Sequence, residues 1–522
     1  IGLGNLHAAQ LSYEEAAACY RAALAVEPKH ATALANLGVA LHFLGDAEGA
    51  MQALDAALAL EPEHAAARWA RALACIPVMR DAETDLGRLR TEFGEALVSL
   101  DRWFAARPDA AGHAAVGTLQ PFWIAYQAED NVALLSSYGR LCSRLMENWL
   151  QSAAPLPRPA RKAGPLRVGI VSRHLRRHSI WSALIKGWMQ GLDRERFALY
   201  GFSLGTVRDA QTRYAESRVR QFVHGPRPLR QWVDAIREAQ PDVLIYPEIG
   251  IDATTIRLAS LRLAPLQATS WGHPETSGLP TIDCYLSAQD FEPEAAAAHY
   301  SERLIALPHL GSYLEPGAAS AAPVDLARWG LAEDAPLLVC PGTPFKYAPE
   351  FDRLFPAIAR RLGRCRFVFF QSGLPGLSDK LRQRLAGAFV REGLAFEAHV
   401  SFVPWMPQAD FHALMRRADA MLDTLGFSGF NTALQAMECG LPVVTREGRF
   451  LRGRLASGVL KRTGVPELVA ADEDQYVALA VRLAQDRGFR AQMRQRIEAG
   501  RPALFGDRAP LRALEEFLAQ GV

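Results

Sequence analysis

The first 66 residues carry a helical hydrophobic pattern that repeats. The segment from Ala22 to His30 returns almost unchanged from Ala56 to His64, an offset of 34 residues, and Leu3-Gly4 returns as Leu37-Gly38 at the same offset. Small alanines let paired helices approach closely, and the proline in each copy ends the second helix of its unit. This period is that of the tetratricopeptide repeat, so we predict such repeats over residues 1–66 rather than an alanine-rich bundle. Because one repeat cannot bury its apolar face alone, we expect at least three, with further units before Ile1 or between residues 66 and 150.

Residues 67–154 keep a helical pattern but lose the period. Bulky apolar side chains lie within this stretch: Trp103, Phe104, Phe122, Trp123 and Tyr126. We interpret it as a helical connector that caps the repeats and joins them to the next domain. Three prolines at positions 155, 157 and 159 then predict an extended linker.

After the linker, short apolar runs alternate with helical stretches. Three runs lie at residues 166–172, 197–203 and 243–246, and a second set lies at 337–340, 367–370, 420–423 and 442–445. Strands that alternate with helices predict a parallel, doubly wound sheet. We therefore expect two Rossmann-like halves, residues 155–320 and 321–522, with the break between residues 308 and 335. Ligands of such sheets bind beyond the carboxyl ends of the strands, which places the site in the cleft between the halves.

Composition narrows the class of protein. The chain has 522 residues, 49% of them hydrophobic and 22% charged, with a formal net charge of +2, as expected of a globular protein of several domains. So small a net charge gives no reason to expect nucleic acid or a membrane as a partner. Seven widely spaced cysteines without a CxxC pair argue against a disulfide framework or a zinc site. We find no long apolar run or signal peptide, so we expect a cytoplasmic location. Because the chain begins inside a helical pattern without methionine, we expect the natural protein to start earlier.

Several common cofactor motifs are missing from the sequence. No GxGxxG follows the first strand, and neither a Walker A sequence nor HExxH occurs. The histidines show no metal-ligand spacing. We therefore expect no metal and no bound cofactor, and a site built from positioned side chains and backbone amides.

Four segments of the C-terminal half follow predicted strands and could bind a phosphate ligand. Thr343 and Lys346 could reach one diphosphate, and Gln371 could contact sugar hydroxyls. Asn431 and Thr432 precede a helix whose free amides would form an anion site. Val403, Pro404 and Trp405 could frame a nucleobase, with His412 at a ribose or phosphate. Each segment alone is also compatible with an ordinary turn, helix cap or structural histidine.

The N-terminal half offers two histidines after strands. His178 follows the first strand, and His273 follows the strand near Gln267. Both would face the proposed cleft as acid–base or polar orienting groups. Asp234, on a predicted helix, is the weakest of the polar candidates.

Three motifs together resemble the tetratricopeptide-linked protein O-GlcNAc transferases, a family that includes Spindly-type proteins and the bacterial adhesin N-glucosyltransferases. The first runs from Leu263 through Trp271-Gly272-His273-Pro274 to Tyr285. The second runs from Ala418 to Thr424 and continues through Asn431-Thr432 to Thr445. The third spans Tyr300 to Pro308. The resemblance covers nearly the whole chain.

This resemblance implies an inverting, metal-independent transferase of the GT-B fold that uses a UDP-sugar as donor. Lys346 matches the family's essential lysine at the donor diphosphate, and Asn431 and Thr432 match residues at the helix end that holds the phosphates. His178 matches a histidine proposed at the acceptor side. Thr343, Gln371 and His273 match the N-glucosyltransferase branch more closely than the animal enzymes.

The chain departs from the animal enzymes at three positions. The animal enzymes have a histidine and two threonines where this chain has Phe430-Asn431-Thr432, and a ribose-binding aspartate where this chain has Gln435. A neutral amide can still donate to or accept from a ribose hydroxyl, so Gln435 stays a candidate donor-binding residue.

The sequence thus predicts transfer of GlcNAc from UDP-GlcNAc to Ser or Thr hydroxyls of an acceptor protein held by the repeats. Lys346, His178 and His273 are the expected catalytic residues. The alternatives are a UDP-glucose-dependent N-glucosyltransferase acting on Asn, a fucosyltransferase of the Spindly kind, and an inactive repeat scaffold, the last favoured by Phe430 and Gln435.

Overall fold

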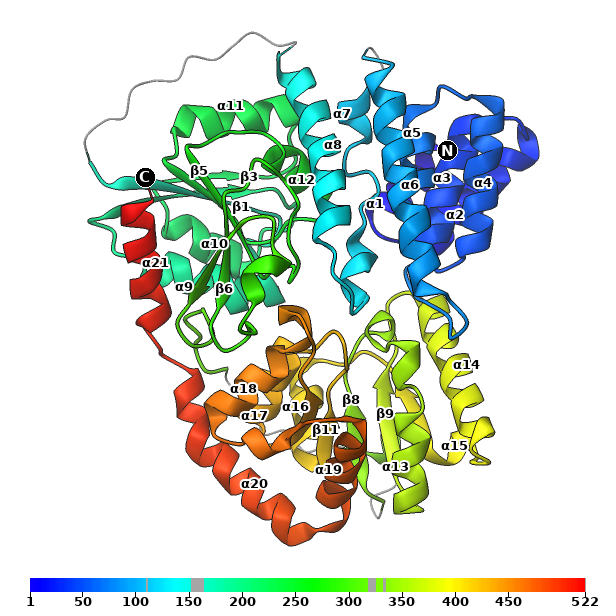
Figure 1. Ribbon diagram of the computed structural model, residues 1–522, viewed down its shortest axis with the longest axis vertical. Helices are drawn as coiled ribbons and strands as arrows, with labels where there is room; N and C mark the ends of the chain where they lie inside the picture. The colour runs from blue at the N-terminus through cyan, green and yellow to red at the C-terminus, as the bar shows by residue number, and fades with distance from the viewer. Residues whose placement is uncertain (109–110, 152–163, 318–324, 332–334, 522) are drawn as a thin grey trace.

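Helical repeats and two α/β halves make up the chain (Figure 1). The computed structural model describes residues 1–108, 111–151, 164–317, 325–331 and 335–521. The linker predicted at residues 155–159 lies outside the described residues. The helical region, drawn in blue and cyan, lies beside the N-terminal half and above the part of the C-terminal half that carries α14 (Pro375–Arg391), and the two halves lie one above the other in this view.

The predicted repeats form antiparallel helix pairs: α1 (Gly2–Ala9) with α2 (Tyr13–Val26), and α3 (Ala31–Phe43) with α4 (Ala47–Leu60). The repeated Leu-Gly dipeptide allows the close approach. A Cβ on Gly38 would lie 2.6 Å from the Leu54 side chain, and one on Gly4 would lie 2.6 Å from the Tyr20 ring. The repeat prediction is therefore confirmed.

The repeat geometry continues one helix beyond residue 66. Helix α5 (Ala65–Leu73) begins at Ala65, 34 residues after Ala31 begins α3. The same cap starts both helices, because His30 Nδ1 accepts from the Ala33 amide at 3.3 Å and His64 Nδ1 accepts from the Ala67 amide at 3.1 Å. Helix α6 (Leu86–Ala105) packs on α5 only after a long loop, which explains why the period disappears from the sequence.

The rest of the connector consists of α7 (Gly112–Ala115), the 3-10 turn η1 (Phe122–Tyr126) and α8 (Val132–Gln151). Helix α8 packs directly on the N-terminal half. A Cβ on Gly139 would lie 2.1 Å from the Gly278 carbonyl oxygen, and Gly278 has a φ of +69°. Two glycines are thus required where the connector meets this half.

The N-terminal half is a parallel sheet of seven strands within the described residues, in the order β3-β2-β1-β4-β5-β6-β7. Its strands are β1 (Leu166–Ser172), β2 (Phe197–Ser203), β3 (Gln221–His224), β4 (Val243–Tyr246), β5 (Leu266–Ser270), β6 (Cys284–Ala288) and β7 (Arg303–Leu307). Its helices include η2 (Trp181–Ile185), α9 (Lys186–Gly191), α10 (Ala210–Ser217), α11 (Leu229–Ala239) and α12 (Ala253–Ala259). The three strands predicted for this half occur at the predicted residues.

The C-terminal half is a parallel sheet of six strands within the described residues, in the order β10-β9-β8-β11-β12-β13. Its strands are β8 (Leu337–Cys340), β9 (Arg366–Phe370), β10 (Val400–Val403), β11 (Ala420–Leu422), β12 (Val443–Arg446) and β13 (Val469–Ala470). Its helices include η5 (Pro344–Lys346), α13 (Leu354–Leu362), α14 (Pro375–Arg391), α15 (Phe396–His399), α16 (Gln408–Arg417), α17 (Phe430–Glu438), α18 (Leu455–Thr463), α19 (Glu473–Gln485) and α20 (Arg487–Gly500). The predicted pair of Rossmann-like halves is confirmed.

The last helix, α21 (Ala509–Gln520), leaves the C-terminal half and packs on the N-terminal half (Figure 1, red). Glu515 accepts from the Asp193 amide at 2.7 Å, and Leu511 lies against Gly191 beside α9. The two halves are therefore connected by the chain at two places.

Candidate active site

Lys346 and Asp423 lie at the point where the strand order of the C-terminal sheet reverses. Strands β8 and β11 are neighbours in this sheet although they are far apart in the chain. Lys346 ends the turn η5 that follows β8, and Asp423 directly follows β11. In doubly wound sheets, ligands bind beyond the strand ends at such a reversal.

Asp423 fixes the loop that leads into α17. Its carboxylate accepts from the Ser428 hydroxyl at 2.6 Å, the Gly429 amide at 2.9 Å and the Thr445 hydroxyl at 2.7 Å. Burial raises the pKa of Asp423, and these hydrogen bonds and Lys346 oppose that effect. The carboxylate therefore sets where α17 begins.

The N-terminus of α17 can bind an anion. Gly429 is its N-cap and supplies no side chain to cap the first amides. Those amides carry the positive end of the helix dipole. Asn431 and Thr432 lie in this first turn and are partly buried, and Gln435 lies one turn beyond Asn431 on the same face. The predicted donor-binding residues of α17 thus share one helix end.

Lys346 is a partly buried cation beside this helix end. Its Nζ lies 4.6 Å from the centre of the Phe427 ring. Burial lowers the pKa of Lys346 to about 8, and the Asp423 carboxylate acts in the opposite direction. The Thr343 hydroxyl, three residues earlier, is buried without a hydrogen-bond partner among the described residues.

His178 lies beyond β1 in contact with a second histidine. The His174 and His178 rings stack with centres 3.8 Å apart at 17°. Burial lowers the pKa of His178 to about 4 and that of His174 to about 3. His178 Nδ1 accepts from the Ile180 amide at 3.2 Å, so the neutral ring carries its hydrogen on Nε2. His178 is therefore placed to donate a hydrogen bond through Nε2.

His273 lies beyond β5 and is covered by the connector. Its ring stacks on Phe122 of η1, with centres 4.9 Å apart at 20°. Burial lowers the pKa of His273 to about 4, and the nearby Arg452 acts in the same direction. His273 is thus uncharged at neutral pH.

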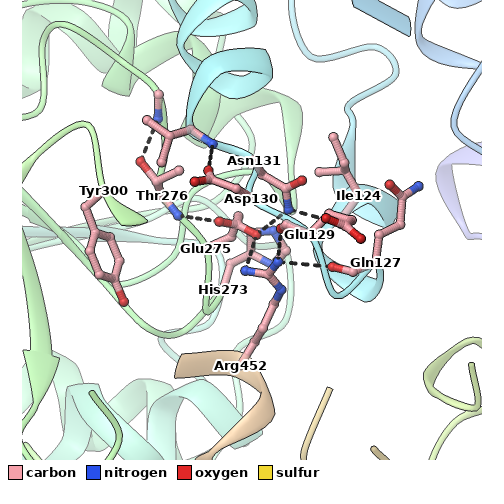
Figure 2. A network of polar contacts seen from close by, with 12 residues as sticks. Ile124, Gln127, Glu129, Asp130, Asn131, His273, Glu275, Thr276, Tyr300 and Arg452 are labelled. Carbon is pink, nitrogen blue, oxygen red and sulfur yellow. Dashed lines mark hydrogen bonds and ion pairs between the residues drawn. The ribbon is translucent and has the colours of Figure 1, made fainter. Parts of the chain in front are cut away.

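A buried polar network joins the connector to both halves near His273 (Figure 2). Arg452 of the C-terminal half lies 2.9 Å from Glu275 of the N-terminal half. Asn131 of the connector donates to the same carboxylate at 2.7 Å, and Arg452 donates to the Gln127 carbonyl oxygen at 3.0 Å. Three parts of the chain therefore meet at the Glu275 carboxylate.

An aromatic cluster closes the same interface. Trp271 of the N-terminal half packs edge-on against Phe430 at the start of α17, with ring centres 4.8 Å apart. Phe291 contacts both rings. Phe430 is thus buried between the halves and is an interface residue.

Comparison with known proteins shows which families parts of the chain resemble. A profile described as "Glycosyl transferase family 41" matches residues 386–508, and tetratricopeptide profiles match residues 4–45 and 31–64. The C-terminal half thus contains a segment similar to glycosyltransferase family 41, and the N-terminal helices are similar to tetratricopeptide repeats.

Two curated relatives align with part of the chain. A UDP-glucose:protein N-beta-glucosyltransferase of Actinobacillus pleuropneumoniae is 29% identical over 290 residues, which are 54% of this chain and 45% of the relative. A probable UDP-N-acetylglucosamine–peptide N-acetylglucosaminyltransferase SPINDLY of Petunia hybrida is 28% identical over 48% of this chain and 26% of the relative. These matches span less than half the length of either relative.

A solved structure supports the fold over nearly the whole chain. An O-GlcNAc transferase mutant of Thermobaculum terrenum matches with a TM-score of 0.71 at 23% identity, covering 99% of this chain and 95% of that chain. The repeats, the connector and both halves therefore have the arrangement of a known structure.

Three predicted residues lie apart from the centre of this site. Gln371 is exposed at the end of β9, where its backbone N–H donates to the Val403 carbonyl oxygen at 2.9 Å. His412 is fully buried in α16, and neither ring nitrogen has a partner among the described residues. Asp234 accepts from Arg230 at 3.0 Å one turn away on α11, as an ordinary helix pair does.

The neighbour of His412 is the more accessible ring. Phe411 is partly buried and packs edge-on against Phe370 at the end of β9, with ring centres 5.5 Å apart. One residue along a helix rotates the side chain by about 100°, so only one of the two can face the strand ends. The sequence analysis placed His412 at a ribose or phosphate and did not consider Phe411.

The region around this site also contains residues that the sequence analysis missed. Arg452, Glu275 and Asn131 were not among the candidates, and Tyr126 and Phe427 were not linked to Lys346. Glu275 could have been identified from the sequence, because it is a charged residue close to the candidate His273. Nothing in the sequence indicated which residues would face one another across the cleft.

Two further structural findings concern ligands and membranes. Among the described residues, no group of three or more His, Cys, Asp or Glu side chains could hold a metal ion. Every described helix is too short or too polar to cross a bilayer.

Proposed function

We propose that this chain is an inverting protein glycosyltransferase that transfers GlcNAc from UDP-GlcNAc to Ser or Thr hydroxyls of acceptor proteins. One observation carries the proposal: Lys346 and the uncapped N-terminus of α17 lie at the same strand reversal, organised around Asp423. An ammonium and a row of free amides at one place suit a nucleoside diphosphate.

In the proposed reaction, the acceptor hydroxyl oxygen forms a bond to the anomeric carbon on the face opposite the UDP. The bond from that carbon to the phosphate oxygen breaks, and UDP leaves with the electron pair. Lys346 and the α17 amides stabilise the negative charge that develops on UDP. The hydroxyl proton passes to water or to the departing diphosphate. Attack from the opposite face inverts the anomeric configuration.

The two histidines act as uncharged orienting groups in this proposal. Burial holds the pKa of both His178 and His273 near 4, which makes each a neutral ring at pH 7. The Nε2–H of His178 would donate to an acceptor or sugar oxygen. Its Nδ1 is occupied by the Ile180 amide and is not available to remove a proton.

Donor contacts are assigned to residues around the same helix end. Thr343 and Lys346 would bind the diphosphate with Asn431 and Thr432. Gln435 would hydrogen-bond the ribose, and Gln371 the sugar. We assign a nucleobase contact to the partly buried ring of Phe411, and no donor contact to the fully buried His412.

The repeats would hold the acceptor protein, and we expect the enzyme to work in the cytoplasm without a metal. In a helical-repeat array the inner face is an extended binding surface. An acceptor segment held there would reach the cleft because the connector packs on both halves.

A second candidate is glucosylation of Asn from UDP-glucose. The Actinobacillus pleuropneumoniae relative carries that activity in its name, and it aligns over 54% of this chain. Thr343, Gln371 and His273 resemble that branch. The inactive-scaffold alternative loses one argument, because Phe430 packs against Trp271 and Phe291 and thus has a structural role.

Calorimetry with a panel of nucleotides and nucleotide sugars tests the proposal on the wild type and on Lys346→Ala. Preferential binding of UDP-GlcNAc that weakens in the variant is the expected result, followed by transfer that mass spectrometry maps to Ser or Thr. A preference for UDP-glucose with modified Asn would support the second candidate, and a preference for GDP-fucose would indicate a fucosyltransferase. Binding of none of these, or transfer undiminished in Lys346→Ala, would overturn the proposal.

A further inference from the structure

We propose that Tyr126 of the connector is a positioning residue for Lys346 that acts through the ring of Phe427. The connector would then form a third wall of the donor site, in addition to joining the repeats to it. This inference rests on the proposed function for its effect on catalysis, but its structural core can be tested without any transfer reaction.

A chain of direct contacts links the connector to the lysine. The Tyr126 and Phe427 rings stack with centres 4.3 Å apart at 23°. The Lys346 Nζ lies 4.6 Å from the centre of the same Phe427 ring. Phe427 therefore contacts the connector and the ammonium at once, and its ring orientation depends on Tyr126.

The connector also contacts the residue next to Lys346. Phe345 packs edge-on against Tyr126 at 4.8 Å and against Trp123 at 5.0 Å between ring centres. Tyr126 thus contacts both the backbone neighbour of Lys346 and the ring beneath its ammonium. Both contacts come from the single turn η1 (Phe122–Tyr126).

The same turn reaches the N-terminal half. Phe122, four residues before Tyr126, stacks on His273. Five residues after Tyr126, Asn131 donates to Glu275. If an acceptor bound to the repeats displaced this segment, the packing around both Lys346 and His273 would therefore change.

Hydrogen bonds hold the backbone of the loop that carries Phe427, but only packing holds the Phe427 ring. Asp423 holds the Ser428 and Gly429 end, and the Thr424 hydroxyl donates to the Phe427 carbonyl oxygen at 2.7 Å. These bonds fix the backbone, whereas the ring is held by packing. Without the Tyr126 ring, Phe427 can turn, and water can reach the Lys346 ammonium.

The test measures the ionisation of Lys346 directly, by competitive acetylation across a pH series with mass spectrometry of the modified peptides. The chain has six lysines, so each can be followed separately. The variants are Tyr126→Ala, Tyr126→Phe, which keeps the ring, and Phe427→Leu, which keeps the site dry but removes the aromatic face. Trp103→Ala is the matched control, because Trp103 is a connector aromatic that contacts Arg68 and Arg107 instead.

In the wild type, half-maximal labelling of Lys346 is expected near pH 8. Tyr126→Ala should raise this midpoint by about one pH unit or more, because water relieves the burial of the ammonium. Tyr126→Phe and Trp103→Ala should leave the midpoint unchanged. Phe427→Leu should leave the midpoint at or below the wild-type value, because no aromatic ring then favours the charged form of Lys346. Transfer by Tyr126→Ala should fall about tenfold in kcat.

An unchanged midpoint in Tyr126→Ala, or an equal rise in Tyr126→Phe and Trp103→Ala, would overturn the inference. If the wild type transfers no sugar, the proposed function fails, but the labelling result still decides whether Tyr126 positions Lys346. A thermal melt of each variant shows that the comparison is made on folded protein.

Discussion

The Arg452 guanidinium and the Glu275 carboxylate form a buried ion pair, 2.9 Å apart, between the two α/β halves. Asn131 donates to the same carboxylate, so the connector takes part in this junction (Figure 2). Taking two charges out of water costs about as much as their attraction returns, so such a pair contributes more to specificity than to stability. We interpret the pair as fixing how the halves and the connector fit together.

Removing one partner of this pair should be strongly destabilising. Arg452→Met leaves the Glu275 carboxylate buried with hydrogen bonds from Asn131 and the Thr276 amide but without a cation, and we expect the two α/β halves to lose about 3–5 kcal/mol of unfolding free energy. Urea denaturation measures this loss. The double variant Arg452→Met with Glu275→Gln should recover part of it, because no buried charge remains unpaired.

Arg88→Met is the matched control for this prediction. Arg88 pairs with Glu92 one turn away on α6, and both side chains are exposed. Such surface pairs are worth little, about 0–0.5 kcal/mol, so this variant should unfold like the wild type. Strictly additive losses for Arg452→Met and Glu275→Gln would contradict the coupling of the two residues.

Donor turnover should decline on the alkaline side of pH 8. Burial lowers the pKa of Lys346 to about 8, so the free enzyme loses the ammonium above that pH. We expect kcat/KM for the donor to fall about tenfold per pH unit there. Steady-state rates from pH 6 to 10 measure the profile. Lys346→Arg should be slower but should lack this decline, because its guanidinium stays charged.

The acid side of the same profile tests the histidines. His178 and His273 have pKa values lowered to about 4, so neither should produce an inflection near pH 6.5. An inflection near pH 6.5 that disappears in His178→Gln would contradict the neutral donor role of His178.

Asp423→Asn should weaken donor binding and shift the alkaline decline. The NH2 of the new asparagine side chain would face the Ser428, Gly429 and Thr445 groups, which are themselves hydrogen-bond donors. The start of α17 would then lose its fixed position. We expect about tenfold weaker UDP binding by calorimetry. The carboxylate also helps keep Lys346 charged, so its removal should move the decline to a pH below 8.

Asp419→Asn is a suitable control for Asp423→Asn. Asp419 lies at the opposite end of β11, where it accepts from the Leu337 amide at 2.8 Å and pairs with Arg490 at 3.3 Å. Its replacement should lower stability but leave UDP affinity and the pH profile unchanged. Equal effects of the two variants on UDP binding would mean that Asp423 acts only through general stability.

The sequence predicted the features that depend on local pattern. The 34-residue period requires small residues such as Gly38 where helices touch, and buried parallel strands such as Leu166–Ser172 appear as continuous apolar runs. Lys346 and Asn431 could be identified because each follows a predicted strand or begins a helix. Their mutual proximity follows from the strand order, which places β8 beside β11.

Features that depend on tertiary contact could not be predicted in this way. Tyr126 and Phe122 were interpreted as apolar anchors of a cap, yet they stack on Phe427 and His273 in the two halves. Glu275 and Arg452 are far apart in the chain, and neither residue type indicates a partner. Whether Phe411 or His412 faces the strand ends depends on how α16 is oriented about its own axis, and the order of apolar and polar residues in this helix does not determine that orientation.

The repeats should lose stability in mild acid because of His42. This side chain of α3 is 1% exposed, and neither ring nitrogen has a partner among the described residues. Burial lowers its pKa to about 4. The unfolded chain binds a proton near pH 6.5, so stability is lost as the pH falls through that value, by about 2 kcal/mol between pH 7.5 and 5.

Replacing His42 by leucine should remove this loss. The difference in unfolding free energy between His42→Leu and the wild type should be about 2 kcal/mol more in favour of the variant at pH 5 than at pH 7.5. Urea unfolding, monitored by pulse-labelling hydrogen exchange of α3 peptides, measures the unfolding free energy of each protein at both pH values. Leu41→Met, a neighbouring buried change without a titratable group, should shift stability equally at the two pH values. An equal shift for His42→Leu at both values would show that the folded repeats accept a proton on His42, which its buried and unpartnered ring argues against.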